Sequence, residues 1–252
     1  MSKPARPDLR ASLSAHTPLY TAWLSLGSPL AVEIVADAGW QAVMIDQQHG
    51  AGGHAELAAC LTAAKAAGVP AMVRVAELDS GLIGRALDAG AQGIMVPMIA
   101  GPEEAARLVR AVKYPPLGGR SLGPYRAKFM IEGDYFAAAN AWTVACAQIE
   151  TAEGVANIEA ICATEGLDMI CLGPNDLAIS LSDGQDRNIR SAAVLEAIER
   201  VRTAAAGRGI VTGIFANDMD FARQMSAAGW QAVSIGTDGG WLAAMARQML
   251  PR

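Results

Sequence analysis

Two acidic side chains stand at the ends of two neighbouring apolar runs. Glu150 directly follows the run 142–149, and Asp176 lies four residues after the run 167–172. Residues 151–164 between the runs favour a helix, so the segment predicts a strand–helix–strand unit. A right-handed crossover between parallel strands puts both carboxyl ends on one side of the sheet, which places the two carboxylates side by side. Such a pair suits a divalent cation such as Mg²⁺ or Mn²⁺, and the alternative is that both are solvated loop acids.

Other chemically useful side chains stand at the ends of further apolar runs. These positions hold Trp23, Asp46 with His49, Arg74, Pro97 and Phe215. Arg74 would place a fixed positive charge beside the acids, suited to a carboxylate or a developing enolate, unless it forms a structural ion pair. His49 is a candidate general base poised by Asp46, and its alternative is an exposed histidine in a flexible glycine-rich loop. Trp23 either walls a pocket or belongs to the core.

The same residue types disfavour covalent mechanisms. The four lysines are Lys3, Lys65, Lys113 and Lys128. None lies within an expected strand or directly at its end, so a Schiff-base mechanism is disfavoured. No cysteine pairs with a histidine at a strand end, and no Gly-x-Ser-x-Gly turn occurs. The four cysteines lack Cys-x-x-Cys spacing, which indicates reduced, buried thiols. Metal-assisted chemistry remains.

Eight apolar runs of strand length alternate with helix-like segments along the chain. The expected strands cover 19–26, 40–45, 70–75, 93–98, 142–149, 167–172, 210–215 and 230–235. Eight such units favour a parallel (β/α)8 TIM barrel, whose functional site lies at the carboxyl ends of the strands. The alternative is an open doubly wound sheet, but no Gly-x-Gly-x-x-Gly follows its first strand.

Chain length and the positions of glycine and proline suggest how the chain is divided into domains, helices and loops. The 252 residues fit one barrel domain over 1–252, with 1–15 as a loosely docked lead-in. Residues 54–67 predict a helix that stops at Gly68. The Pro- and Gly-rich segment 113–126 predicts a long loop, which in a compact barrel is usually functional or mobile.

Composition excludes several classes of partner. The net charge is -5 and the basic residues are scattered, so we expect neither a nucleic-acid nor a membrane partner. No apolar run has the length of a membrane helix, and residues 1–10 lack the apolar core of a signal peptide, which favours a cytoplasmic protein. Hydrophobic residues reach 52% while aromatics are only 5%, so aliphatic side chains and methionine must fill the core.

Four segments of the chain resemble the HpcH/HpaI aldolase family of metal-dependent pyruvate aldolases. They are Val-Met-Ile-Asp-Gln-Gln-His at 43–49, the segment 87–98, Gly-Arg-Ser-Leu-Gly-Pro-Tyr-Arg at 119–126, and Gln-Ile-Glu-Thr at 148–151 with Gly-Pro-Asn-Asp-Leu at 173–177. The resemblance implies a (β/α)8 barrel of the phosphoenolpyruvate/pyruvate-binding type. It also implies a homo-oligomer, a trimer or hexamer, in which the last helix is often exchanged between subunits.

The resemblance also assigns roles to particular residues. Glu150 and Asp176 would hold a divalent metal, Mg or Mn with Co or Zn as further options, and pyruvate would chelate it. Arg74 would stabilise the enolate. His49 would act as the base through a metal-bound water, in a dyad with an aspartate that similar enzymes take from a neighbouring subunit, a position matched here by Asp88. The pyruvate pocket would be lined by Gln148, Gly173 and Pro174. Phe215 stands where the family places an apolar pocket residue.

The implied reaction is reversible cleavage of a 4-hydroxy-2-oxo acid to pyruvate and an aldehyde. The family usually has glutamate where this chain has Gln48, which changes the charge near His49. Arg126 is expected to bind the substrate, and together with Tyr125 and Lys128 it could select an acidic aldehyde. One alternative is a malyl- or citramalyl-coenzyme A lyase on the same scaffold, although the short chain shows no basic patch for the coenzyme. The other is a non-catalytic sugar-acid binding protein.

Overall fold

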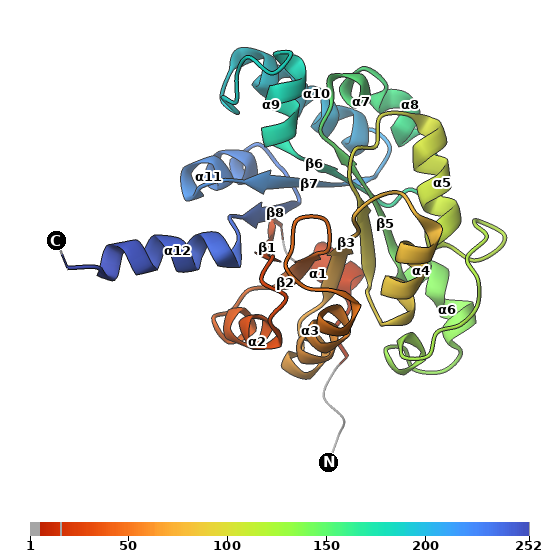
Figure 1. Ribbon diagram of the computed structural model, residues 1–252. Helices are drawn as coiled ribbons and strands as arrows, with labels where there is room; N and C mark the ends of the chain where they lie inside the picture. Colours follow the sequence, from red (N-terminus) through yellow and green to blue (C-terminus); the bar gives the residue numbers. More distant parts are fainter. Residues whose placement is uncertain (1–5, 16, 252) are drawn as a thin grey trace.

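Eight parallel strands close into a barrel in the computed structural model, which describes residues 6–15 and 17–251 (Figure 1). The strands are β1 (Leu19–Leu24), β2 (Ala42–Asp46), β3 (Ala71–Arg74), β4 (Gly93–Val96), β5 (Val144–Ile149), β6 (Met169–Leu172), β7 (Val211–Ala216) and β8 (Ala232–Ile235). Each strand pairs in parallel with its neighbours in sequence, and β8 closes on β1. The expected (β/α)8 class is confirmed, and the open sheet is not.

Helices surround the strands (Figure 1). They are α1 (Leu9–Ala15), α2 (Pro29–Asp37), α3 (His54–Ala67), α4 (Ser80–Asp88), α5 (Pro102–Val112), α6 (Tyr135–Trp142), α7 (Ala152–Ala156), α8 (Ile158–Cys162), α9 (Pro174–Leu181), α10 (Ala192–Ala206), α11 (Met219–Ala227) and α12 (Asp238–Met249), with a 3-10 turn η1 at Ala127–Phe129. The expected helix 54–67 has the observed bounds. It ends because Gly68 adopts the left-handed conformation, with a φ of 76°, which terminates the hydrogen-bonded ladder.

One helical segment differs from expectation. The expected helix 151–164 is two short helices that meet at Asn157, whose side chain donates to the carbonyl of Ala100 at 2.8 Å. A side chain that bonds to backbone in this way competes with continued helix formation. The segment after β6 forms the short helix α9, in which Leu177 and Ala178 are buried.

The lead-in also differs from the loosely docked segment expected over 1–15. Within its described part, α1 buries Leu9 and Leu13 against the interior of the barrel. The backbone N–H of Leu9 donates to Oε1 of Gln92 at 2.7 Å. The physical reason is that the amino end of a barrel leaves apolar interior side chains uncovered, and two leucines one helical turn apart can close it.

The barrel interior is filled mainly by methionine and small side chains. Its buried cluster contains Leu9, Leu13, Leu19, Trp23, Ala42, Met44, Met72, Met95, Val144, Cys146, Met169, Cys171 and Ala232. Methionine fills irregular gaps because it is unbranched and flexible. Gly213 leaves the room that the end of Met169 occupies, so a side chain there would overlap it. The interior is therefore packed, and only its carboxyl end is free to form a site.

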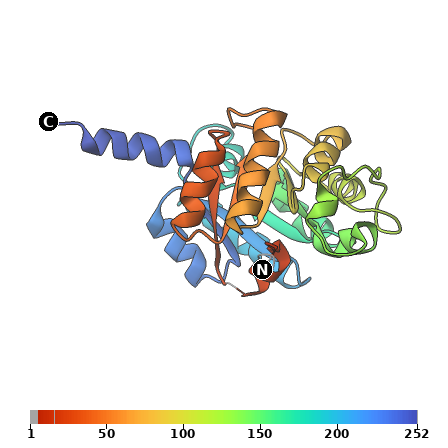
Figure 2. The same ribbon diagram turned by 90° about the horizontal axis from the view of Figure 1, so that it is seen from below.

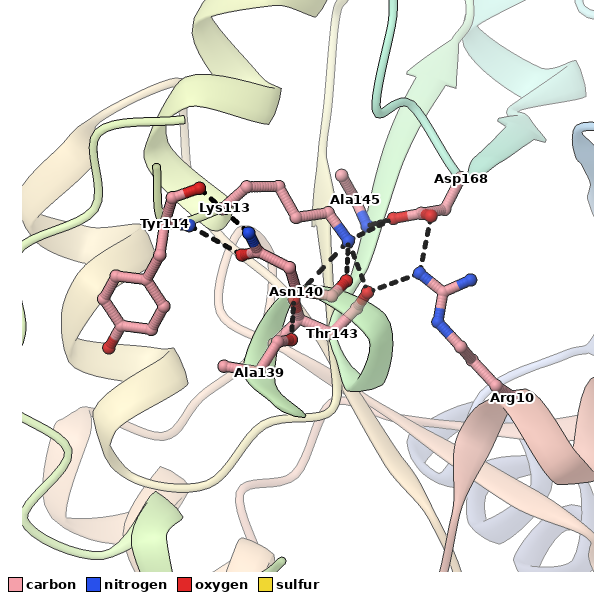
Figure 3. Close-up of polar contacts among 8 residues, drawn as sticks. All are labelled: Arg10, Lys113, Tyr114, Ala139, Asn140, Thr143, Ala145 and Asp168. Atoms are coloured by element: carbon pink, nitrogen blue, oxygen red, sulfur yellow. Dashed lines mark hydrogen bonds and ion pairs between the residues drawn. The ribbon is translucent and has the colours of Figure 1, made fainter. Parts of the chain in front are cut away.

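A buried ion pair joins elements at the amino end of the strands (Figure 3). Lys113 is 1% exposed, and its Nζ lies 2.7 Å from Oδ2 of Asp168. Asp168 also accepts from the guanidinium of Arg10 at 2.5 Å and from the N–H of Ala145 at 2.8 Å. Burial lowers the pKa of Lys113, and the neighbouring Asp168 opposes that shift. One carboxylate thus connects α1, the end of α5 and the start of β5.

The last helix leaves the body of the barrel in both views (Figures 1 and 2). Its apolar side chains Leu242, Met245 and Met249 are exposed. The exchange of this helix with a neighbouring subunit stays a prediction. Within 6–15 and 17–251, no helix is both long and apolar enough to cross a membrane.

We predict that Asp168→Asn lowers the free energy of unfolding by about 2–4 kcal/mol, since removing one partner strands a buried charge on Lys113. The matched control is Asp220→Asn, which breaks an exposed pair with Arg223 and should cost at most about 0.5 kcal/mol. Urea denaturation measures both. Similar effects for the two variants would show that the buried pair contributes no more than a surface pair.

Candidate active site

A cavity of about 340 Å³ opens at the carboxyl ends of the strands. It is lined by Trp23, Ser25, Asp46, His49, Arg74, Gln148, Glu150, Gly173, Pro174, Asn175, Asp176, Phe215 and Thr237. Ten of these residues were expected at the site from the sequence. The volume suits a small acid rather than a large coenzyme.

The carboxylate of Glu150 is buried at the end of β5 and held at both oxygens. Its Oε1 accepts from the backbone N–H of Met98 at 2.8 Å, and its Oε2 accepts from Nε2 of Gln148 at 2.6 Å. Burial raises the pKa of Glu150 to about 7, and the negative charge of Asp176 adds to the shift. Asp176 itself is exposed in the first turn of α9. The two acids therefore interact across adjacent strand ends.

The surroundings of Glu150 fit a hard divalent cation. Gly173 borders the carboxylate so closely that a Cβ there would lie 2.5 Å from Oε2 of Glu150. The Oε1 atom of Gln148 is buried without a hydrogen-bond partner, as expected of a group that a bound water or hydroxyl completes. No group of three or more His, Cys, Asp or Glu that could hold a metal is found over 6–15 and 17–251, so two carboxylates would share the ion with oxygens of water and substrate. That donor set is typical of Mg²⁺ or Mn²⁺.

A buried ion pair faces the acids from β2 and β3. The guanidinium of Arg74 binds Asp46 through two hydrogen bonds, Nε to Oδ1 at 3.0 Å and Nη2 to Oδ2 at 2.5 Å. It also lies 4.7 Å from the ring centre of Trp23, whose Nε1 donates to Asp46 at 3.2 Å. Burial alone would raise the pKa of Asp46, but the bonds from Arg74 outweigh it and lower the pKa. Arg74 is thus a structural ion pair that also lines the cavity.

Asp46 does not have the partner expected for it. Its Oδ1 accepts from the backbone N–H of Gln48 at 3.0 Å and of His49 at 3.3 Å, and no bond to the imidazole of His49 is found in the described structure. The expected role of Asp46 in poising the His49 ring is therefore not what the contacts show. The carboxylate is already saturated by Arg74 and by the backbone of its own loop.

The loop after His49, for which flexibility was the alternative interpretation, is held by backbone contacts. Gly50 packs against the backbone of Asp46 so closely that any side chain would overlap the Asp46 carbonyl. The N–H of Ala51 donates to the carbonyl of Ser25 at 2.7 Å. The imidazole of His49 is exposed at the rim of the cavity on this fixed loop.

Two expected site residues lie outside the cavity. Arg126 donates to the carbonyls of Ala89 at 2.5 Å and Leu61 at 3.1 Å. Its guanidinium joins the end of α4 to the middle of α3, and Arg126 is absent from the cavity lining of this chain. Its contact with the substrate stays a prediction. Asp88 pairs with Arg120 at 2.6 Å and is also absent from the cavity lining. Its role from a neighbouring subunit stays a prediction.

Three lining residues were missed in the sequence. Ser25 directly follows β1, Thr237 follows β8 by two residues, and Asn175 lies between Pro174 and Asp176. All three stand at strand ends, which was the signal that could have found them. Trp23 and Phe215 form an aromatic part of the lining, with ring centres 5.2 Å apart.

Comparison with known proteins gives consistent matches. The family model described as HpcH/HpaI aldolase/citrate lyase matches residues 19–244. The chain is 38% identical to a hydroxypyruvate/pyruvate aldolase of Paraburkholderia phytofirmans over 250 residues, 96% of this chain and 95% of the relative. It is 34% identical to a 5-keto-4-deoxy-D-glucarate aldolase of Klebsiella pneumoniae over 91% of this chain and 90% of that one. A crystal structure of an HpcH/HpaI aldolase/citrate lyase family protein from Burkholderia cenocepacia superposes with a TM-score of 0.87 at 39% identity, over 95% of this chain and 96% of the other.

We predict that Gly173→Ala weakens Mn²⁺ binding by at least about tenfold, because the added methyl displaces the Glu150 carboxylate. Gly101→Ala is the matched control, since Gly101 also precedes a helix-starting proline but has nothing within 4 Å of its Cβ position. Isothermal titration calorimetry with Mn²⁺ measures both affinities. Equal affinities would show that Gly173 does not shape the site.

Mn²⁺ affinity should also depend on pH around neutrality. The pKa of Glu150 is raised to about 7, so the carboxyl is largely protonated at pH 6 and must lose its proton to bind a cation. We therefore expect binding about tenfold weaker at pH 6 than at pH 8, with proton release on binding at the lower pH. Calorimetry in buffers of different ionisation enthalpy detects the released proton. Constant affinity across this range would mean that Glu150 is ionised before the metal arrives.

Proposed function

The chain belongs to the HpcH/HpaI aldolase/citrate lyase family, and we propose that it is a divalent-metal-dependent aldolase that reversibly cleaves a 4-hydroxy-2-oxo acid to pyruvate and an aldehyde. One observation carries the proposal: Glu150, Asp176 and Arg74 meet around one small cavity at the carboxyl ends of the strands. The residue set has two anionic ligands for a cation and one fixed cation for a developing anion. Carbon–carbon cleavage next to a keto group needs both.

Glu150 and Asp176 are the residues that would hold the metal, with Mg²⁺ and Mn²⁺ favoured by their oxygen donors. When bound, the ion supplies a Lewis acid for the keto oxygen on which negative charge develops. Gln148 orients Glu150 through the 2.6 Å bond to its Oε2. Gly173 provides the space in which that carboxylate lies.

Arg74 is proposed to stabilise the enolate. Its guanidinium is buried, always charged and fixed by Asp46 and Trp23, so it does not reorganise as charge develops. Asp46 balances the charge of Arg74 and holds its guanidinium in place through two hydrogen bonds. Trp23 and Phe215 would enclose the apolar end of pyruvate.

His49 is proposed as the general base. Its imidazole accepts the proton of the 4-hydroxyl as the bond between C3 and C4 breaks, and the electron pair of that bond becomes the enolate. Proton transfer to C3 then gives pyruvate. Asp88 of a neighbouring copy is proposed to orient the imidazole, which requires a homo-oligomer. Gln48 leaves this position uncharged where the family usually has a carboxylate.

The proposal is tested without knowing the aldehyde. We predict that the chelated protein exchanges the methyl protons of pyruvate with deuterated buffer only after Mg²⁺ or Mn²⁺ is added, as measured by proton NMR. Glu150→Gln and Asp176→Asn should reduce exchange to the buffer background, because each removes a ligand charge. The control Asp186→Asn changes an exposed acid in the loop beyond α9 and should keep the full rate.

Exchange identifies the enolisation step, and pyruvate release from 4-hydroxy-2-oxo acids then identifies the aldehyde. Absence of exchange under either metal, with pyruvate still bound, would replace the aldolase by a sugar-acid binding protein. Exchange that needs no metal in the chelated protein would overturn the assignment of the two ligands.

A further inference from the structure

The backbone of Met98 adopts an unusual conformation at the mouth of the barrel. Its φ is 60°, and Asp183 is the other non-glycine residue with positive φ in the described chain. Side chains with a Cβ are disfavoured in this left-handed region. Such a conformation persists only where its surroundings enforce it, and it often marks a functional position.

The conformation redirects one backbone N–H. Strand β4 ends at Val96, and the following Pro97 has no N–H to donate. Met98 then turns its N–H out of the ladder toward Oε1 of Glu150, at 2.8 Å. Ile99 returns to the neighbouring strand and donates to the carbonyl of Gln148 at 3.1 Å. The strained residue is thus the one whose N–H reaches a side chain in the cavity.

The side chain of Met98 does not explain its conformation. It is 52% exposed and belongs to none of the three buried hydrophobic clusters, although Val96 and Ile99 on either side are buried. An exposed methionine gains little from packing. What the conformation achieves is the bond to Glu150.

That bond completes the fixation of one proposed ligand. Glu150 has one donor on each oxygen, the Met98 N–H and the Gln148 amide, which leaves a lone pair of each oxygen free for a cation. Asp176 has no hydrogen bond to its carboxylate in the described structure and is exposed. Of the two acids, Glu150 is the preorganised one and Asp176 the adjustable one.

We propose that Met98 is a positioning residue whose left-handed backbone lets its N–H face Glu150 while Ile99 keeps its bond to Gln148, and so presets the metal site. The inference rests on the metal role proposed for Glu150. It predicts that cation affinity depends on how well residue 98 tolerates positive φ and not on its side chain.

Substitutions of Met98 distinguish the effect of its backbone conformation from the effect of its side chain. Met98→Gly and Met98→Asn tolerate the left-handed region and should keep the Mn²⁺ dissociation constant within about threefold of the parent. Met98→Val, which is β-branched and tolerates that region poorly, should weaken Mn²⁺ binding by at least about tenfold. Mn²⁺ affinity is measured from free-ion electron paramagnetic resonance, and Tm is measured in parallel on metal-free protein.

Asp183 supplies the matched control. It has a φ of 51° but lies after α9 and outside the cavity lining, so Asp183→Val imposes a similar backbone penalty away from the site. We expect this variant to lower Tm while leaving Mn²⁺ affinity unchanged. Met98→Val should lower both.

The outcomes distinguish the two proposals. If the parent protein binds Mn²⁺ and Met98→Val binds it equally well, the role of Met98 is overturned while the metal site stands. Loss of Mn²⁺ binding in Met98→Gly, which tolerates positive φ best, would show that the side chain matters and would also overturn the proposal. If the parent protein does not bind Mn²⁺, the metal assignment itself fails.

Discussion

The architecture of the site depends on keeping two carboxylates close together in a partly buried cavity. Like charges at adjacent strand ends repel, and burial of Glu150 increases the cost, which is why its pKa rises to about 7. Several neighbouring groups reduce the free-energy cost of burying the Glu150 carboxylate without neutralising the two acids. The amide of Gln148 and the N–H of Met98 donate to Glu150, and Gly173 leaves room for it. A divalent cation is the group that would remove the remaining repulsion.

The second charged pair explains why that negative charge survives. Arg74 could have neutralised Glu150, but its guanidinium is bound at two atoms by Asp46. Asp46 and Arg74 together carry no net charge, so Arg74 does not neutralise the two acids. Arg74 still acts on Glu150 at longer range and opposes the rise of its pKa. The cavity therefore combines two acids that can bind a cation with one fixed positive group. This arrangement suits a bound anion that gains negative charge during the reaction.

Much of this arrangement could be predicted from the sequence because parallel barrels place strand ends on one face. The period of the apolar runs located the strands, and Glu150, Asp176, Arg74 and His49 followed from position alone. Side-chain partners could not be predicted in the same way. Arg126 looked suited to an anion, but its guanidinium binds the backbone carbonyls of Ala89 and Leu61, partners that tertiary packing brings within reach. The conformation of Met98 likewise depends on where Glu150 lies, which no local pattern encodes.

The two ends of the barrel have different roles: the amino end stabilises the fold, and the carboxyl end forms the candidate active site. At the amino end, α1 covers the interior, and Asp168 satisfies Lys113, Arg10 and a backbone N–H together (Figure 3). At the carboxyl end, by contrast, a residue with positive φ, a buried acid of raised pKa and an amide oxygen without a partner are retained. Each of these features costs folding free energy, and a closed barrel stabilised from its other end can tolerate them. The unfavourable features gather where a ligand would relieve them, because binding can compensate only the groups that it touches.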